Sequence, residues 1–127
     1  MALSEFREEQ RFSRLMDQCV AARQAQLELR LAESASEIDL RAGGRTSDEA
    51  VHQFHGGYES LAKATYSLDL IAPQSLRERG RALLAAVTDQ GVVVVRTASL
   101  DEFEAAKTRS RQEADAFNAA CANSVGR

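Results

Sequence analysis

The sequence lacks long apolar runs and an excess of basic residues. Its apolar runs, among them Val92–Val95, are far shorter than the roughly 18 apolar residues of a transmembrane helix. Residues 1–9 are too highly charged for a signal peptide. The net charge is −3 with both signs interspersed, whereas nucleic-acid-binding proteins usually carry a basic patch or stripe. We therefore expect a cytoplasmic protein whose partners include neither a membrane nor a nucleic acid.

The motifs of common catalytic and cofactor-binding sites are also missing. No nucleophile-elbow, Walker A or Rossmann glycine pattern occurs. With only two histidines, His52 and His55, one chain cannot supply both Glu-x-x-His motifs of a di-iron bundle. Either cysteine, Cys19 or Cys121, would need a nearby base to act as a nucleophile, and we expect both histidines near the opposite end of the bundle from Cys19. The sequence therefore predicts no enzymatic activity and no cofactor.

What the sequence does contain predicts helices. Its 127 residues suit one domain, and it is rich in alanine, the best helix former. Thr46–Glu49 and Ser99–Glu102 both have the Ser/Thr-x-x-Glu form of a capping box. Pro73 suits a helix start, and Gly43–Gly44 suits a helix end. We therefore expect a single all-α domain over residues 1–127, a four-helix up-down-up-down bundle with an elongated first helix. The expected helices span about residues 4–42, 47–71, 73–98 and 100–123.

Each expected helix carries an apolar stripe with helical spacing, which we expect to form the core. In the first helix this stripe is Phe12, Met16, Val20, Leu27, Leu31, Ala35 and Ile38. In the others the largest members are Phe54, Leu61, Leu68, Leu76, Leu83, Phe103 and Phe117. The valines after Gly91 also suit a strand, but a lone strand would have no partner in this chain, so we expect a helix.

The two cysteines are expected to meet. Short connections make neighbouring helices antiparallel, so the first and fourth helices finish at the same end. This arrangement places Cys19 and Cys121 in one layer. Two cysteines in an intracellular chain are most often buried and reduced. We therefore expect free thiols within several ångströms of each other, with a disulfide only under oxidation.

The first helix is expected to outreach the other three by roughly 20 Å. Residues 1–17 would then form a projecting extension, and exposed apolar side chains on it would mark an interface. The expected interface residues are Leu3, Phe6, Phe12, Leu15 and Met16. The partner is either a second copy or a different protein. The alternatives are a helix that bends near Gln18 and folds back over the bundle end, or a frayed tail.

A weak metal site is the other candidate. His52, His55 and Glu59 share a helical face, and imidazole and carboxylate ligands suit zinc or nickel. The alternative interpretation is a partly exposed polar flank without a metal, and we favour it.

The middle of the chain resembles a known pattern. Residues 58–64, followed by Leu68-x-x-Ile71-Ala72-Pro73-x-x-Leu76-x-x-x-Gly80, are similar to a recurring pattern in uncharacterised helical proteins of actinobacteria. In those proteins a leucine-rich helix ends in Ala-Pro and a second helix follows. The resemblance implies the same helical hairpin and brings no activity, cofactor or functional residue with it.

Two functions follow from this sequence. The first is a small non-enzymatic bundle that acts by protein–protein contact, as an adaptor, regulator or assembly subunit. The second is a bundle that binds a small ligand or a metal between its helices, beside the glycines. Those glycines are Gly56, Gly57, Gly80 and Gly91.

Overall fold

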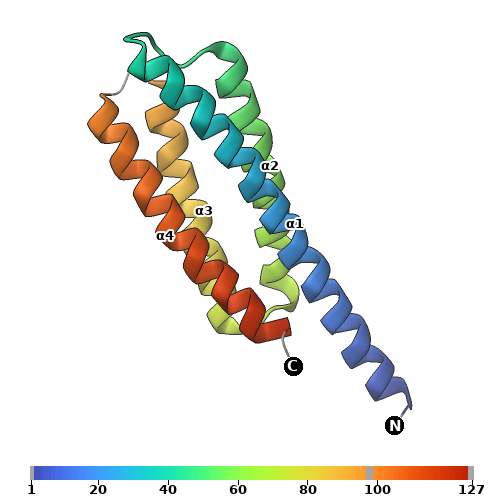
Figure 1. Ribbon diagram of the computed structural model, residues 1–127. Coiled ribbons are helices and arrows are strands. Elements are labelled where there is room, and N and C mark those ends of the chain that lie inside the picture. Colours follow the sequence, from blue (N-terminus) through green and yellow to red (C-terminus); the bar gives the residue numbers. More distant parts are fainter. Residues whose placement is uncertain (1, 97–98, 126–127) are drawn as a thin grey trace.

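The computed structural model describes residues 2–96 and 99–125. This part of the chain forms four helices: α1 (Ala2–Arg41), α2 (Asp48–Ile71), α3 (Gln74–Val95) and α4 (Leu100–Val125). Each helix packs against the next, and α4 packs against α1, which closes the bundle (Figure 1). The predicted all-α four-helix fold with an elongated first helix is confirmed. Met1, in the predicted extension, and Ala98, at the predicted end of the third helix, lie outside the described residues.

The helix ends follow most of the expected local signals. Gly43 ends α1 with a φ of 81°, a conformation that only glycine adopts without strain. The hydroxyl of Ser99 accepts the backbone N–H of Glu102 at 3.1 Å, as a capping box requires. The expected cap at Thr46 is wrong by one residue, because Ser47 caps α2 by accepting the N–H of Ala50. Thr46 is buried instead, with its hydroxyl 2.6 Å from that of Ser36.

The predicted stripes of α2, α3 and α4 form the core. Most of their large members are buried, among them Phe54, Leu61, Leu68, Leu76, Leu83, Phe103 and Phe117. The valine run Val92–Val95 belongs to α3, so the helical interpretation is confirmed.

The predicted core stripe of α1 is wrong. The large apolar residues of the predicted stripe face outward, and apart from two leucines the buried face carries small or polar side chains. The buried residues of α1 are Leu15, Ala22, Ala25, Gln26, Leu29, Ala32, Glu33 and Ser36. Gly57 lets α2 approach α1 closely: a Cβ placed on Gly57 would lie only 3.0 Å from Cγ and 3.2 Å from the backbone nitrogen of Leu29. The face of α1 with mostly small side chains is thus the one that packs against the other helices.

Cys19 and Cys121 form a disulfide. The predicted shared layer is confirmed, because their Cα atoms lie 6.0 Å apart, within the usual range for a disulfide. The prediction of free thiols is wrong. The bridge connects the middle of α1 to the last turns of α4 and closes a loop with a sequence separation of 102.

Candidate functional site

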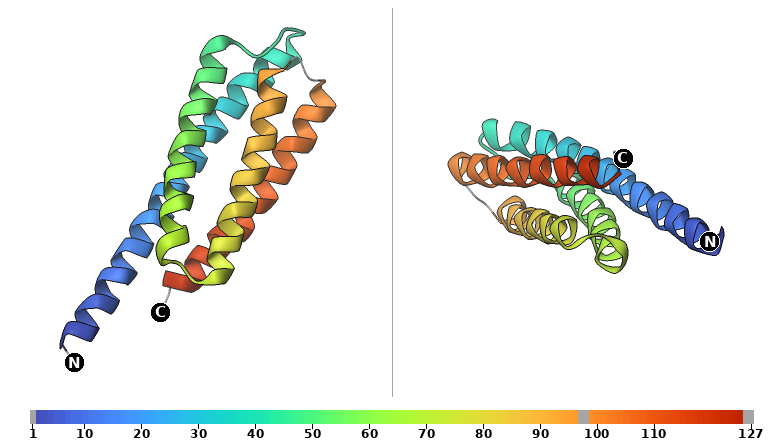
Figure 2. Two further views of the ribbon diagram at one scale, coloured as in Figure 1. Left: turned by 180° about the vertical axis from the view of Figure 1, so that it is seen from behind. Right: turned by 90° about the horizontal axis from the view of Figure 1, so that it is seen from below.

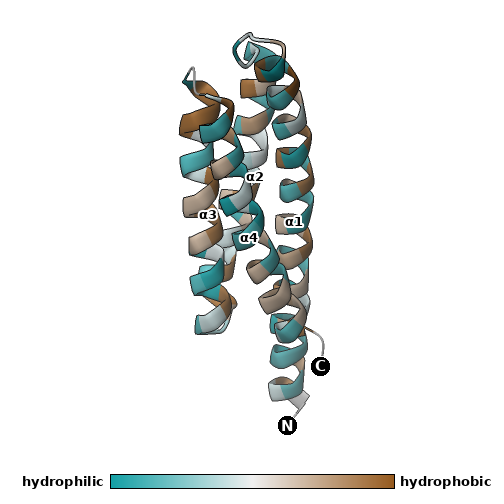
Figure 3. Ribbon diagram, turned by 60° about the vertical axis from the view of Figure 1, so that its left-hand side comes forward, coloured by the Kyte–Doolittle hydropathy of each residue, from teal (hydrophilic) through white to brown (hydrophobic). Residues whose placement is uncertain are grey.

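The outward face of α1 carries a row of large apolar side chains that no other helix covers. We call five of them the outward stripe: Met16, Val20, Leu27, Leu31 and Ile38. At 100° per residue they fall within about 60° of one another around the helix. Leu31 is 62% exposed and Ile38 is 69% exposed. Brown, hydrophobic segments recur along α1 in Figure 3. The bundle thus keeps on its surface the most hydrophobic side of its longest helix.

The N-terminal turns of α1 continue this helix beyond the bundle. Figure 2 shows α1 extending past the ends of the other three helices. Leu3, Phe6 and Phe12 are exposed there, as expected for an interface. The helix runs through Gln18 without a break, so the chain does not fold back at that point. Leu15 is a correction to the predicted interface set, because it is only 6% exposed and belongs to the core.

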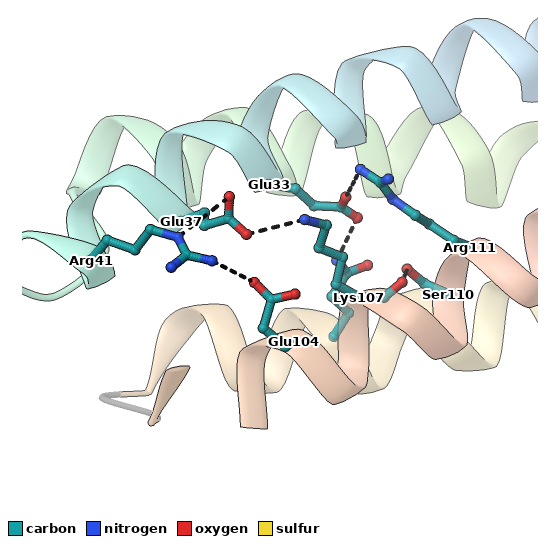
Figure 4. Close-up of polar contacts among 8 residues, drawn as sticks. Glu33, Glu37, Arg41, Glu104, Lys107, Ser110 and Arg111 are labelled. Atoms are coloured by element: carbon teal, nitrogen blue, oxygen red, sulfur yellow. Dashed lines mark hydrogen bonds and ion pairs between the residues drawn. The ribbon is translucent and has the colours of Figure 1, made fainter. Parts of the chain in front are cut away.

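The opposite side of α1 contacts α4 through a ladder of polar pairs. Each rung joins one residue of α1 to one of α4: Gln26 to Asn118, Glu33 to Arg111, Glu37 to Lys107 and Arg41 to Glu104. Figure 4 shows the three charged rungs side by side. The α1 partners advance along the chain as the α4 partners recede, which is the register of an antiparallel pair. The ladder therefore fixes how far α4 is shifted along α1.

Two carboxylates of α1 carry negative charge in this ladder. Glu33 is buried and accepts a hydrogen bond from Gln90 of α3, and its other oxygen lies 3.5 Å from Arg111. A side-chain hydrogen bond with Glu104 and the ammonium group of Lys107 lower the pKa of Glu37 below its ordinary value of 4.5. These charges are neutralised within the bundle, so we assign this seam a structural role.

A hollow lies between α2 and α3. It is an open groove of about 740 Å³ near the end of the bundle where α2 begins. Its walls are mainly apolar, from Val51, Phe54, Tyr58, Val87, Val92 and Val95. The hydroxyl groups of Tyr58 and Thr88 are 3.1 Å apart and provide one polar contact across it. A groove of this size and lining suits a mostly apolar ligand.

The histidines line the same groove, but they do not form the metal-ligand set that was considered as a candidate. His55 pairs with Glu59 at 3.0 Å, and both side chains are more than half exposed. Within residues 2–96 and 99–125, no three His, Cys, Asp or Glu residues are arranged to hold a metal ion. His52, His55 and Glu59 therefore form a polar flank of α2 in this structure.

Sequence reasoning missed the outward stripe as a surface and the groove as a hollow. The signal for the stripe was present in the alanines of α1, whose spacing marks the buried side of this helix. The groove had no local signal, because it depends on how far apart α2 and α3 lie. No family model, curated protein or solved structure matches this chain. No helix in the described part of the chain is long and apolar enough to cross a membrane.

Proposed function

We propose that this protein is a non-enzymatic helical bundle that acts by protein–protein contact, as an adaptor, a regulator or an assembly subunit. The outward stripe of α1 carries the proposal. Its five side chains expose on the order of 500 Å² of apolar surface, and Leu3, Phe6 and Phe12 add further exposed apolar side chains on the projecting turns. Contiguous apolar patches above a few hundred Å² usually mark interaction sites on water-exposed proteins. A partner that covers the outward stripe would remove this apolar surface from water.

The chemistry of the described residues supports a role without catalysis. Cys19 and Cys121 are joined, so neither is a free thiol nucleophile. His55 lies at the surface in a pair with Glu59. One oxygen of the buried Glu33 carboxylate accepts a hydrogen bond from Gln90, and the other lies 3.5 Å from Arg111 without a hydrogen bond. The groups that enzymes commonly use are thus either bonded to one another or spread over the surface.

Site-specific photocrosslinking tests the proposal. A benzoylphenylalanine at position 31 places the reactive group on the outward stripe, and the same residue at position 70 is the matched control on α2. Leu70 is 86% exposed, so both substitutions leave the core intact. We expect protein adducts from position 31 and few from position 70 after irradiation in intact cells. Equal labelling at the two positions, or none at position 31, would contradict the proposal.

The second candidate function is binding of a small apolar ligand in the α2–α3 groove. The observation in its favour is a groove of about 740 Å³ with apolar walls. Val92 is 56% exposed on its rim, so Val92→Glu places a charge there without disturbing the core. We expect apolar fluorescent probes to bind the wild type and to bind Val92→Glu more weakly. Leu70→Glu is the control, since it changes an exposed apolar residue outside the groove.

The compartment in which the protein acts follows from the state of its cysteines. The sequence favours the cytoplasm, whereas disulfides persist mainly in oxidising compartments. Alkylation of thiols in intact cells, followed by mass spectrometry, separates the two. Unmodified Cys19 and Cys121 that remain bridged place the protein in an oxidising compartment, and alkylated thiols support the cytoplasm.

A further inference from the structure

We infer that the partner of α1 is a second copy of this chain, with the two α1 helices parallel and joined along their outward stripes. This inference rests on the proposed function and names its partner. The spacing of the stripe, its area and the charges on either side of it all support a parallel pair of α1 helices.

The outward stripe repeats every eleven residues. Met16, Leu27 and Ile38 form one series, and Val20 and Leu31 form the other. An eleven-residue repeat corresponds to about 3.67 residues per turn, close to the α-helix itself, so the stripe runs almost straight along α1. A partner must then present a straight apolar face about 33 Å long. The α1 helix of a second copy has the same repeat and matches the stripe layer by layer.

No other helix in the described part of the chain offers such a face. The remaining large exposed apolar residues come in pairs, Tyr66 and Leu70 on α2 and Val92 and Val95 on α3. A pair spans about one helical turn, whereas the outward stripe spans six. A contact of the stripe with its own equivalent also forms a closed dimer, because the same patch serves both copies.

The area agrees with a dimer. Each copy contributes on the order of 500 Å² of apolar surface from the five side chains of the outward stripe. Two copies together reach about 1,000 Å², which is where stable biological interfaces begin.

The flanking charges favour the parallel orientation. Arg23 and Arg30 lie along one edge of the stripe, and Asp17 and Glu28 lie along the other. In a parallel pair opposite edges meet, so Arg23 of each copy lies beside Glu28 of the other, five residues further along the helix. In an antiparallel pair like edges meet, so Arg23 of each copy would lie beside Arg30 of the other. Complementary charges thus select one orientation.

Sedimentation equilibrium of the full chain over a range of concentrations tests the dimer. We expect a mass near twice 13.9 kDa for the wild type. Leu27→Glu with Leu31→Glu should weaken association at least about 100-fold, because it places charges in two layers of the stripe. Both residues are more than half exposed, so the variant should keep its helical circular dichroism. Leu70→Glu is the matched control and should remain dimeric.

A cysteine at position 34 tests the orientation. Ser34 is exposed between the layers of Leu31 and Ile38. In a parallel pair the two copies of position 34 face each other, whereas an antiparallel pair centred on the stripe holds them about 21 Å apart along the helix axis. Ser34→Cys should therefore form a crosslinked dimer under mild oxidation, and Leu70→Cys should not. A dimer that Leu27→Glu with Leu31→Glu dissociates, but that Ser34→Cys fails to crosslink, would overturn the parallel arrangement.

The remaining outcomes separate this inference from the proposed function. A wild type that is monomeric at every concentration overturns the second copy as partner. In that case the proposed function survives only if position 31 still crosslinks to a different protein in cells. A wild-type dimer that the double α1 substitution leaves intact overturns the inference, because the dimer contact would then lie elsewhere on the chain, and the proposed function again depends on crosslinking of position 31 to a different protein.

Discussion

The two opposite seams of this bundle are built from different contacts. The α1–α4 seam has a disulfide and four polar pairs between the helices. The α2–α3 seam has apolar walls, an open groove with a single hydroxyl contact over it, and one ion pair, between Asp69 and Arg81. Polar pairs with directional geometry fix the relative shift of two helices, whereas apolar walls do so only weakly. The bundle is therefore held in register on one side and left accessible on the other.

The largest expected effect is loss of the disulfide. Cys19→Ser with Cys121→Ser should lower the free energy of unfolding by about 4 kcal/mol, because the bridge closes a loop with a sequence separation of 102. Urea denaturation measures this value. A reducing agent should destabilise the wild type by a similar amount and leave the double variant unchanged. A double variant as stable as the oxidised wild type would show that the polar ladder alone holds the seam.

The buried part of the ladder should give the next largest effect. Glu33→Leu removes the acceptor of the buried amide of Gln90, which should cost about 1–3 kcal/mol. Glu33→Leu combined with Gln90→Leu should recover most of this loss, because apolar replacements of buried polar pairs are often neutral. Urea denaturation of the single and double variants checks the difference. A double variant less stable than Glu33→Leu would contradict this account.

The difference between local signals and contacts between helices explains how much of the fold the sequence could predict. Capping residues, Pro73 and Gly43 act locally, so they marked the helices to within a few residues. In α2, α3 and α4 the large apolar residues with helical spacing are mostly the buried ones, so periodicity identified the core. The length difference between the helices then placed Cys19 beside Cys121.

Periodicity identified the wrong face of α1 as the core, because the most hydrophobic face of this helix is not its buried face. Leu27 and Leu31 form the stronger stripe, yet Ala25 and Ala32 face the core. The sequence of a single helix does not indicate which of two faces the neighbouring helices will cover. The partners of Glu33 lie on α3 and α4, so the polar face of α1 gains its contacts only after assembly. The candidate interface was therefore found at the projecting turns and missed along the rest of the helix.

The α2–α3 seam should respond weakly to loss of its hydroxyl contact. Tyr58→Phe removes the hydroxyl that Thr88 contacts, at a site open to water, and should cost no more than about 0.5 kcal/mol. Tyr66→Phe, at an exposed tyrosine of the same helix, is the matched control. Urea denaturation of both variants gives the contribution of the contact. A loss above that of the Glu33→Leu variant would reverse the ranking of the two seams.

The smallest expected effect is the pH dependence of the α1–α4 seam. The pKa of Glu37 is lowered in the folded protein by a hydrogen bond with Glu104 and by Lys107. Its ionised form thus favours the folded state, and this contribution is complete above the ordinary pKa of 4.5. The contribution is lost as the pH falls through the lower folded pKa. Glu37→Gln should therefore make the free energy of unfolding fall less steeply as the pH decreases below 4.5, and Glu104→Ala should reduce the slope in the same way. Unfolding curves at several acidic pH values measure the slope, and a wild-type slope in both variants would remove Glu37 from the acid response of this seam.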